Sequence, residues 1–304
     1  MPGIAILNHS TIRIPMNEKP SERPFQRIVL TGAAGKLGSL LRVPLRALAT
    51  TLVLSDIKSL DTPLVEGETF QACDLADHDA VRELLTGAEL VVHFGGISRE
   101  QPFEPILHGN IVGQFNLYDN ALNLGVKRVV LASSNHVTGG YRTDEIVGPR
   151  QPMRPDGLYA ISKAYGELLA SFYHDRHGLE SVCLRIGTCI PEPTSPRSLS
   201  SWLSYGDLVE LVRCAALAPA VGYAVVYGAS NNTQSWWHDD DAARIGYQPR
   251  DNADDYREEI ERLHPQAIAS ARQGGPIFVR DYRKPETLVF PAPAQPATEL
   301  DDKR

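Results

Sequence analysis

The sequence predicts an α/β protein with a doubly wound parallel sheet of about seven strands and a small C-terminal substrate lobe. Short apolar runs of strand length alternate with helical stretches, which is typical of parallel strands covered on both faces. Near the start, a turn that contains Gly32, Gly35 and Gly38 joins such a run to a helix-like run. The next apolar run ends in an acid, Asp56. Together these features favour a Rossmann-type nucleotide-binding sheet.

The order of the elements follows from the apolar pattern. We expect strands at residues 28–30, 51–56, 69–73, 90–94, 126–131, 181–186 and 223–227. Helices are predicted after the glycine turn, after the capping residue Asp77, from Asn110, and over residues 157–177. The predicted domains are an N-terminal extension at 1–26, a nucleotide-binding domain at 27–187 that includes the returning strand at 223–227, a substrate lobe at 188–280 and a tail at 281–304.

Composition excludes several classes of protein. The 304 residues carry a net charge of -7 and scattered arginines, so no nucleic-acid partner is expected. The four cysteines lack metal-ligand spacing, which favours reduced thiols and a cytoplasmic location. No apolar run is long enough to cross a membrane, and residues 4–7 are too short for the core of a signal peptide. Met16 is an alternative translation start.

Two groups of possible metal ligands are interpreted as structural. His174 and His177 share a helix face without an acidic or cysteine partner, so a solvated face is expected. The three aspartates at 239–241 are expected in the first turn of a helix, where negative charge suits the helix dipole. We therefore predict no metal site.

The glycine turn and the acids after the next strands predict a dinucleotide site. Glycines allow a tight turn and let the backbone approach a pyrophosphate at a helix N-terminus. Asp56 lies near the offset of about 20 residues at which a carboxylate meets the adenosine ribose. It favours NAD over NADP, although Lys36 and Lys58 leave NADP open. Asp74 could reach the adenine amino group or could be a turn aspartate.

Tyr159 and Lys163 are one helical turn apart, so both side chains project from the same helix face. The preceding strand ends at Ser133 and Ser134, and Gly95 and Gly96 end the strand before that. A tyrosine titrates near pH 10, so its pKa must fall by about 3 for it to act as a base at neutral pH. We expect the Lys163 ammonium and an oxidised nicotinamide to lower it. The alternative is a surface pair without catalytic function.

Here the chain resembles the extended short-chain dehydrogenase/reductase superfamily. Its glycine motif, loop acid, helix asparagine, serine, tyrosine and lysine match Gly32, Gly35, Gly38, Asp74, Asn110, Ser134, Tyr159 and Lys163. The resemblance implies catalysis by Ser134, Tyr159 and Lys163 with NAD as the cofactor. The residues expected to contact NAD are Gly32, Ala34, Gly35, Lys36, Leu37, Gly38, Asp56, Asp74, Leu75, Gly95, Gly96, Asn110, Tyr159 and Lys163.

Several segments are similar to one branch of the superfamily, the uronate dehydrogenases. These are residues 95–98 with 102–104, 132–136, 154–159, 185–189 with 191–193, and 199–202. The branch implies oxidation of a hexuronic acid, galacturonate or glucuronate, at C1 to the aldarolactone, with Tyr159 as the general base. It also implies substrate contacts from Ser98, Ser134, Asn135, His136, Tyr159, Thr188 and Arg197.

Some of these assignments have alternatives. Arg197 would bind the carboxylate in this family, but could be a solvated loop arginine, and Arg185 is a competing cation inside a predicted strand. Thr188 stands where the family has a serine, and His136 is equally consistent with a core histidine. The rival enzyme is an NAD-dependent nucleotide-sugar epimerase or dehydratase, and the rival of another class is a non-catalytic dinucleotide sensor. A homo-oligomer is expected from the resemblance.

Overall fold

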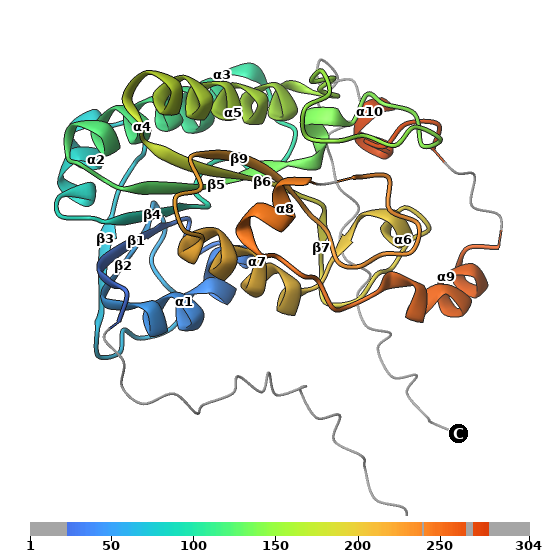
Figure 1. Cartoon of the computed structure of the whole chain (residues 1–304), viewed down its shortest axis with the longest axis horizontal. Helices are drawn as coiled ribbons and strands as arrows, with labels where there is room; N and C mark the ends of the chain where they lie inside the picture. Colours follow the sequence, from blue (N-terminus) through green and yellow to red (C-terminus); the bar gives the residue numbers. More distant parts are fainter. Residues whose placement is uncertain (1–22, 239, 266–269, 280–304) are drawn as a thin grey trace, which may run out of the picture.

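The computed structural model describes residues 23–238, 240–265 and 270–279, and it shows a parallel sheet between two layers of helices (Figure 1). The predicted tail at 281–304 and most of the predicted extension at 1–26 lie outside the described residues. The first strand begins at Phe25, so the last two residues of that predicted extension belong to the sheet.

The main sheet has seven strands in the order β3-β2-β1-β4-β5-β6-β9, and every neighbouring pair is parallel. This confirms the predicted doubly wound sheet. The strands are β1 (Phe25–Thr31), β2 (Ala49–Asp56), β3 (Glu68–Ala72), β4 (Leu90–His93), β5 (Arg128–Ser134), β6 (Glu180–Ile186) and β9 (Tyr223–Gly228). The strand order reverses between β1 and β4, and a ligand crevice opens at the carboxyl ends of strands at such a point.

Helices cover both faces because the strands are apolar on both. In β1, Ile28 and Leu30 face one core cluster, whereas Val29 between them faces the other. The first cluster lies under α1 (Lys36–Leu48), α7 (Tyr205–Leu217) and α8 (Asp240–Ile245). The second lies under α2 (His78–Leu85), α4 (Gly113–Asn123) and α5 (Leu158–His177).

The helix predicted from Asn110 is longer and less regular than expected. It consists of α3 (Phe103–Ile106), a π-helical turn η1 (Leu107–Val112) and α4, which follow one another without a break. π-turns of this kind occur frequently at functional sites. Here the turn contains Asn110, which is buried.

After β6, the elements α7, β9 and α8 belong to the main sheet and its helix layer, whereas the remaining segments form a smaller lobe beside the carboxyl ends of the strands (Figure 1). The core of this lobe is a parallel pair, β7 and β8, joined by α6. The bounds of its elements are β7 (Thr188–Cys189), α6 (Ser198–Ser201), β8 (Trp202–Leu203), η3 (Ala253–Tyr256), α9 (Arg257–Leu263) and α10 (Pro276–Val279). A short 3-10 turn, η2 (Asn135–Thr138), follows β5 on the side of this lobe. Within the described ranges, no helix is both long and apolar enough to cross a bilayer.

Candidate active site

A cleft of about 1000 Å³ opens at the carboxyl ends of the central strands. With the exception of Asn110, every residue predicted to contact cofactor or substrate lines it. They are Gly32, Ala34, Gly35, Lys36, Leu37, Gly38, Asp56, Asp74, Leu75, Gly95, Gly96, Ser98, Ser134, Asn135, His136, Tyr159, Lys163, Thr188 and Arg197. The fold therefore brings together residues that are spread over most of the sequence.

The glycine turn fits a pyrophosphate. Gly32 has φ +72°, and a Cβ there would lie 2.5 Å from the Phe94 carbonyl. A Cβ on Gly38 would lie 2.0 Å from the Gly32 oxygen, so the helix can approach the strand only without side chains here. No side chain caps the N-terminus of α1, and its first turn holds no acid. The free N–H groups and the helix dipole at this end therefore suit an anion.

Two acids, Asp56 and Asp74, line the cleft near the ends of β2 and β3. Asp56 accepts hydrogen bonds from the backbone N–H groups of Ala34 and Lys58, both at 3.1 Å, which ties the end of β2 to the glycine turn. Asp74 accepts from the backbone N–H of Ala76 at 2.9 Å and lies 3.0 Å from the His108 ring. These hydrogen bonds hold the pKa of Asp74 below its usual range. Asp74 is thus a turn aspartate that also faces the cleft.

Asn110 does not line the cleft. Its side chain is buried, and its Oδ1 accepts from the backbone N–H of Ile97 at 2.7 Å. Its Nδ2 donates to the Ile97 carbonyl at 3.0 Å and to Ser162 Oγ at 2.8 Å. Its amide groups are used inside the protein, where they join the loop after β4 to α5, and its direct contact with the cofactor stays a prediction.

Tyr159, Lys163 and Ser134 meet inside the cleft. Tyr159 and Lys163 lie on one face of α5, and both are buried. Lys163 Nζ donates to the Ala132 carbonyl at 2.8 Å and lies 5.8 Å from the centre of the Tyr159 ring. The Ser134 hydroxyl forms a hydrogen bond that favours the phenolate of Tyr159. The surface alternative for the pair is excluded because neither side chain is on the surface.

The sequence predicts that Lys163 lowers the pKa of Tyr159, but Lys163 is not among the groups that shift this pKa in the structure. Burial raises the pKa of Tyr159 to about 12, and this outweighs the opposing effect of Ser134. Burial also lowers the pKa of Lys163 to about 8. The lysine therefore keeps its charge at neutral pH, but the chain alone does not make the phenol acidic.

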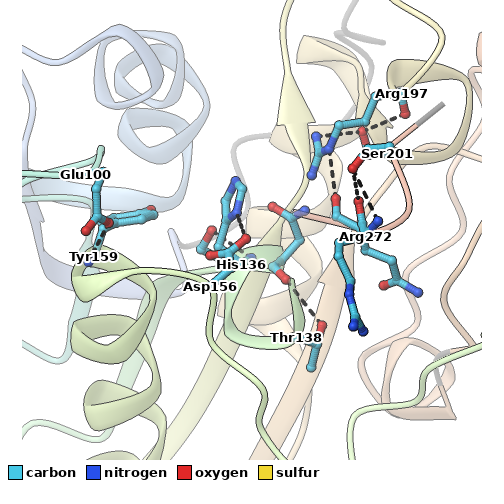
Figure 2. A network of polar contacts seen from close by, with 12 residues as sticks. Glu100, His136, Thr138, Asp156, Tyr159, Arg197, Ser201 and Arg272 are labelled. Carbon is cyan, nitrogen blue, oxygen red and sulfur yellow. Dashed lines mark hydrogen bonds and ion pairs between the residues drawn. The ribbon is translucent and has the colours of Figure 1, made fainter. Parts of the chain in front are cut away.

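A distant carboxylate fixes the start of the catalytic helix. Glu100 is buried, and it accepts from the backbone N–H of Leu158 at 2.8 Å and from that of Tyr159 at 3.0 Å (Figure 2). It replaces the cap that Gly157 cannot supply, and a Cβ on Gly157 would lie 2.4 Å from its carboxylate. Glu100 leaves no local signal in the sequence because its partners lie far along the chain.

Arg197 also lines the cleft and lies just before α6. Its Nε donates to the Gln273 carbonyl at 2.8 Å, and its Nη1 donates to Thr188 Oγ1 at 2.8 Å and to Ser201 Oγ at 3.2 Å (Figure 2). With the Asn135 amide turned to suit its neighbours, Asn135 Oδ1 accepts from Nη2 at 2.7 Å. Burial lowers the pKa of Arg197 to about 10. Across the described ranges no carboxylate forms an ion pair with it.

The competing cation, Arg185, is structural as its strand position indicated. It is 1% exposed and pairs with Glu167 at 2.8 Å. Its Nη1 also donates to the Tyr227 hydroxyl at 3.0 Å. Among the described residues, no group of three or more histidine, cysteine, aspartate and glutamate side chains could hold a metal ion.

The parallel sheet carries a glycine turn that fits a pyrophosphate, and a buried Tyr-Lys-Ser set lies at its carboxyl edge. Together these features define an NAD-dependent oxidoreductase. The chain belongs to the NAD dependent epimerase/dehydratase family, whose model matches residues 28–248.

Within that family, the chain is similar to uronate dehydrogenases. It is 47% identical to the uronate dehydrogenase of Pseudomonas syringae pv. tomato, over 79% of this chain and 88% of that protein. The crystal structure of uronate dehydrogenase from Agrobacterium tumefaciens is 43% identical with a TM-score of 0.82, over 85% of this chain and 98% of that chain. A mutant of the latter, complexed with NAD, matches with the same identity, TM-score and coverage.

Proposed function

We propose that this protein oxidises a hexuronic acid, galacturonate or glucuronate, at C1 with NAD and forms the aldarolactone. The observation that carries the proposal is Arg197, an enclosed guanidinium in the cleft without an ion-pair partner among the described residues. The similarity to uronate dehydrogenases supports the same substrate class.

Arg197 is suited to bind the substrate carboxylate. An enclosed charge is costly unless an opposite charge meets it, and neutral oxygens accept its hydrogen bonds here. A carboxylate that enters the cleft would supply the missing negative charge, and the one N–H of Nη2 that these contacts leave unused could donate to it. Thr188 and Asn135 then contribute by orienting Arg197 as well as by lining the sugar site.

The catalytic set supports proton removal from the C1 hydroxyl. Bound NAD would accept the hydride from C1 and would bring a positive charge near the phenol. Tyr159 would take the hydroxyl proton as phenolate, so that the C1–O bond becomes a carbonyl. Ser134 would hold the same oxygen by a hydrogen bond, and the Lys163 charge would favour the phenolate. Ser98 and His136 remain to bind hydroxyls of the ring.

The substrate class is tested by incubating the protein and NAD with uronates, neutral aldoses and UDP-sugars while NADH absorbance is followed. Galacturonate or glucuronate should give NADH, and neutral aldoses should react far more weakly. Turnover of UDP-sugars without net NADH would instead support an epimerase or dehydratase. Binding of NAD without any turnover would support a dinucleotide sensor.

The choice of cofactor is predicted to depend on Asp56. Asp56→Ala removes the carboxylate that would bind the ribose hydroxyls and repel a 2′-phosphate. We expect the preference of kcat/KM for NAD over NADP to fall by about tenfold or more. Steady-state kinetics with both cofactors measure this ratio, and an unchanged ratio would contradict the role of Asp56. Asp61→Ala, outside the cleft, is the control.

We further propose a homo-oligomer that associates through α5. Ile161, Leu168 and Phe172 lie on one helix face and are 50%, 61% and 52% exposed. Phe115 of the adjacent α4 is 46% exposed, and Figure 1 places both helices in the outer layer. Contiguous apolar surface of this kind marks association sites. Phe172→Asp is expected to shift the solution mass toward the monomer in sedimentation velocity, and an unchanged mass would refute this interface.

A cytoplasmic location is part of the same proposal. The four cysteines are unpaired thiols, as is usual where thiols are kept reduced.

A further inference from the structure

Behind the sugar side of the cleft, a buried carboxylate supports His136. Asp156 Oδ2 lies 2.7 Å from His136 Nδ1, and the Asp156 side chain is 0% exposed (Figure 2). His136 itself lines the cleft, and its ring meets the Tyr159 ring edge-on at 6.4 Å. Asp156 is therefore one step removed from the site where the substrate would react.

The chain makes room for this carboxylate at two glycines. A Cβ on Gly139 would lie 2.0 Å from Asp156 Oδ2, and a Cβ on Gly274 would lie 1.8 Å from it. Gly274 is separated from Asp156 by more than a hundred residues and is held by a backbone hydrogen bond to the Gly139 carbonyl at 2.9 Å. Two distant segments thus enclose one carboxylate group.

Hydrogen bonds within the fold do not account for the burial of Asp156. Its second oxygen, Oδ1, is buried and has no hydrogen-bond partner among the described residues. Burying an acceptor without a partner destabilises a protein, so a carboxylate kept in such a place needs another reason. Two groups of the substrate pocket supply that reason: His136, which bonds Asp156, and Arg197, whose charged form Asp156 favours.

The hydrogen bond fixes which nitrogen of His136 carries a proton. An ionised carboxylate only accepts hydrogen bonds, so Nδ1 must be the donor. In the neutral ring, Nε2 is then the acceptor, and in the part of the chain that the structure describes no group is bonded to it. Nε2 is left to form a hydrogen bond with a hydroxyl in the cleft. The negative charge of Asp156 also favours the charged form of Arg197.

We propose that Asp156, seated between Gly139 and Gly274, is a positioning residue for sugar-acid binding: its hydrogen bond to Nδ1 holds the His136 ring so that Nε2 can bond a ring hydroxyl of the substrate. The proposal rests on the function proposed above. It adds a residue that does not touch the substrate and assigns Gly274, in the C-terminal part of the chain, to the substrate site.

The first test is Asp156→Asn, which keeps the volume and removes the charge. Whether the amide oxygen accepts from Nδ1 or the amide nitrogen donates to it, the charge-assisted hydrogen bond that fixes the ring is lost. We expect the KM for galacturonate to rise by about tenfold or more, while the dissociation constant for NAD and the thermal midpoint change little. Asp144→Asn, an exposed aspartate paired with Arg142, is the matched control and should leave the KM unchanged.

A double-mutant cycle separates positioning from a general structural effect. If Asp156 acts through His136, the variant that combines Asp156→Asn with His136→Ala should have the same KM as His136→Ala alone. Additive effects would overturn the proposal.

Gly274→Ala should raise the KM in the wild-type background and not in the His136→Ala background. Gly206→Ala, where a Cβ meets only ordinary contacts, is its control.

The experiments distinguish a wrong role for Asp156 from a wrong substrate class. If no uronate yields NADH with the wild-type protein, the substrate class is wrong. If the wild type oxidises uronate and Asp156→Asn keeps its KM, the substrate class stands and the role of Asp156 is refuted.

Discussion

Tyr159→Phe is expected to lower kcat for uronate oxidation by about 10²- to 10⁴-fold, the range that general base catalysis contributes. The change removes only the hydroxyl, which Ser134 contacts inside the cleft. NAD binding should persist because the glycine turn and Asp56 are untouched. Stopped-assay kinetics and calorimetric titration with NAD measure the two quantities. Tyr173→Phe, on the same helix and outside the cleft, is the control and should keep its kcat.

The pH dependence of the wild type provides an independent check on Tyr159. Its pKa is raised by burial, so the phenolate becomes more populated as the pH rises, and the rate should increase with pH. Lys163, with a pKa of about 8, loses its supporting charge above that pH, so the increase should become shallower there. A rate that falls between pH 6 and pH 8 would contradict proton removal by Tyr159.

Arg197→Met is expected to lower kcat/KM for galacturonate by about 30-fold or more, since losing one partner of an enclosed ion pair costs about 2–5 kcal/mol. Methionine keeps much of the volume and removes the charge. The weak rate with a neutral aldose should change far less, because that substrate brings no carboxylate. Comparing the two substrates isolates the effect of the arginine charge on kcat/KM. An equal loss of kcat/KM with both substrates would indicate that the substitution disrupts the structure of the site. Arg262→Met, an exposed arginine, is the control.

The sequence predicts the sheet well because its strands are apolar runs separated by clear turns. The glycine turn, Asp56 and the Tyr159–Lys163 pair are local patterns, and the structure brings all of them to one cleft. Local patterns do not contain the contacts that orient these groups. Asn110 is on the predicted helix, but a π-turn aims its amide at Ile97 instead of the cleft.

Local sequence patterns also do not predict the environment of each side chain in the fold. The charge of Lys163 is next to Tyr159 as predicted, yet burial dominates and raises the pKa of the phenol. Asp156 is inside a segment that resembles uronate dehydrogenases, but its partners His136 and Gly274 become neighbours only in the fold. Such long-range pairs leave no spacing signal in a single sequence.

Net oxidation of a uronate by NAD is tested most directly by the stoichiometry of NADH to galacturonate. With excess NAD, a catalytic amount of protein and limiting galacturonate, we expect one NADH for each galacturonate consumed. Consumption of galacturonate without NADH, or no consumption at all, would contradict it.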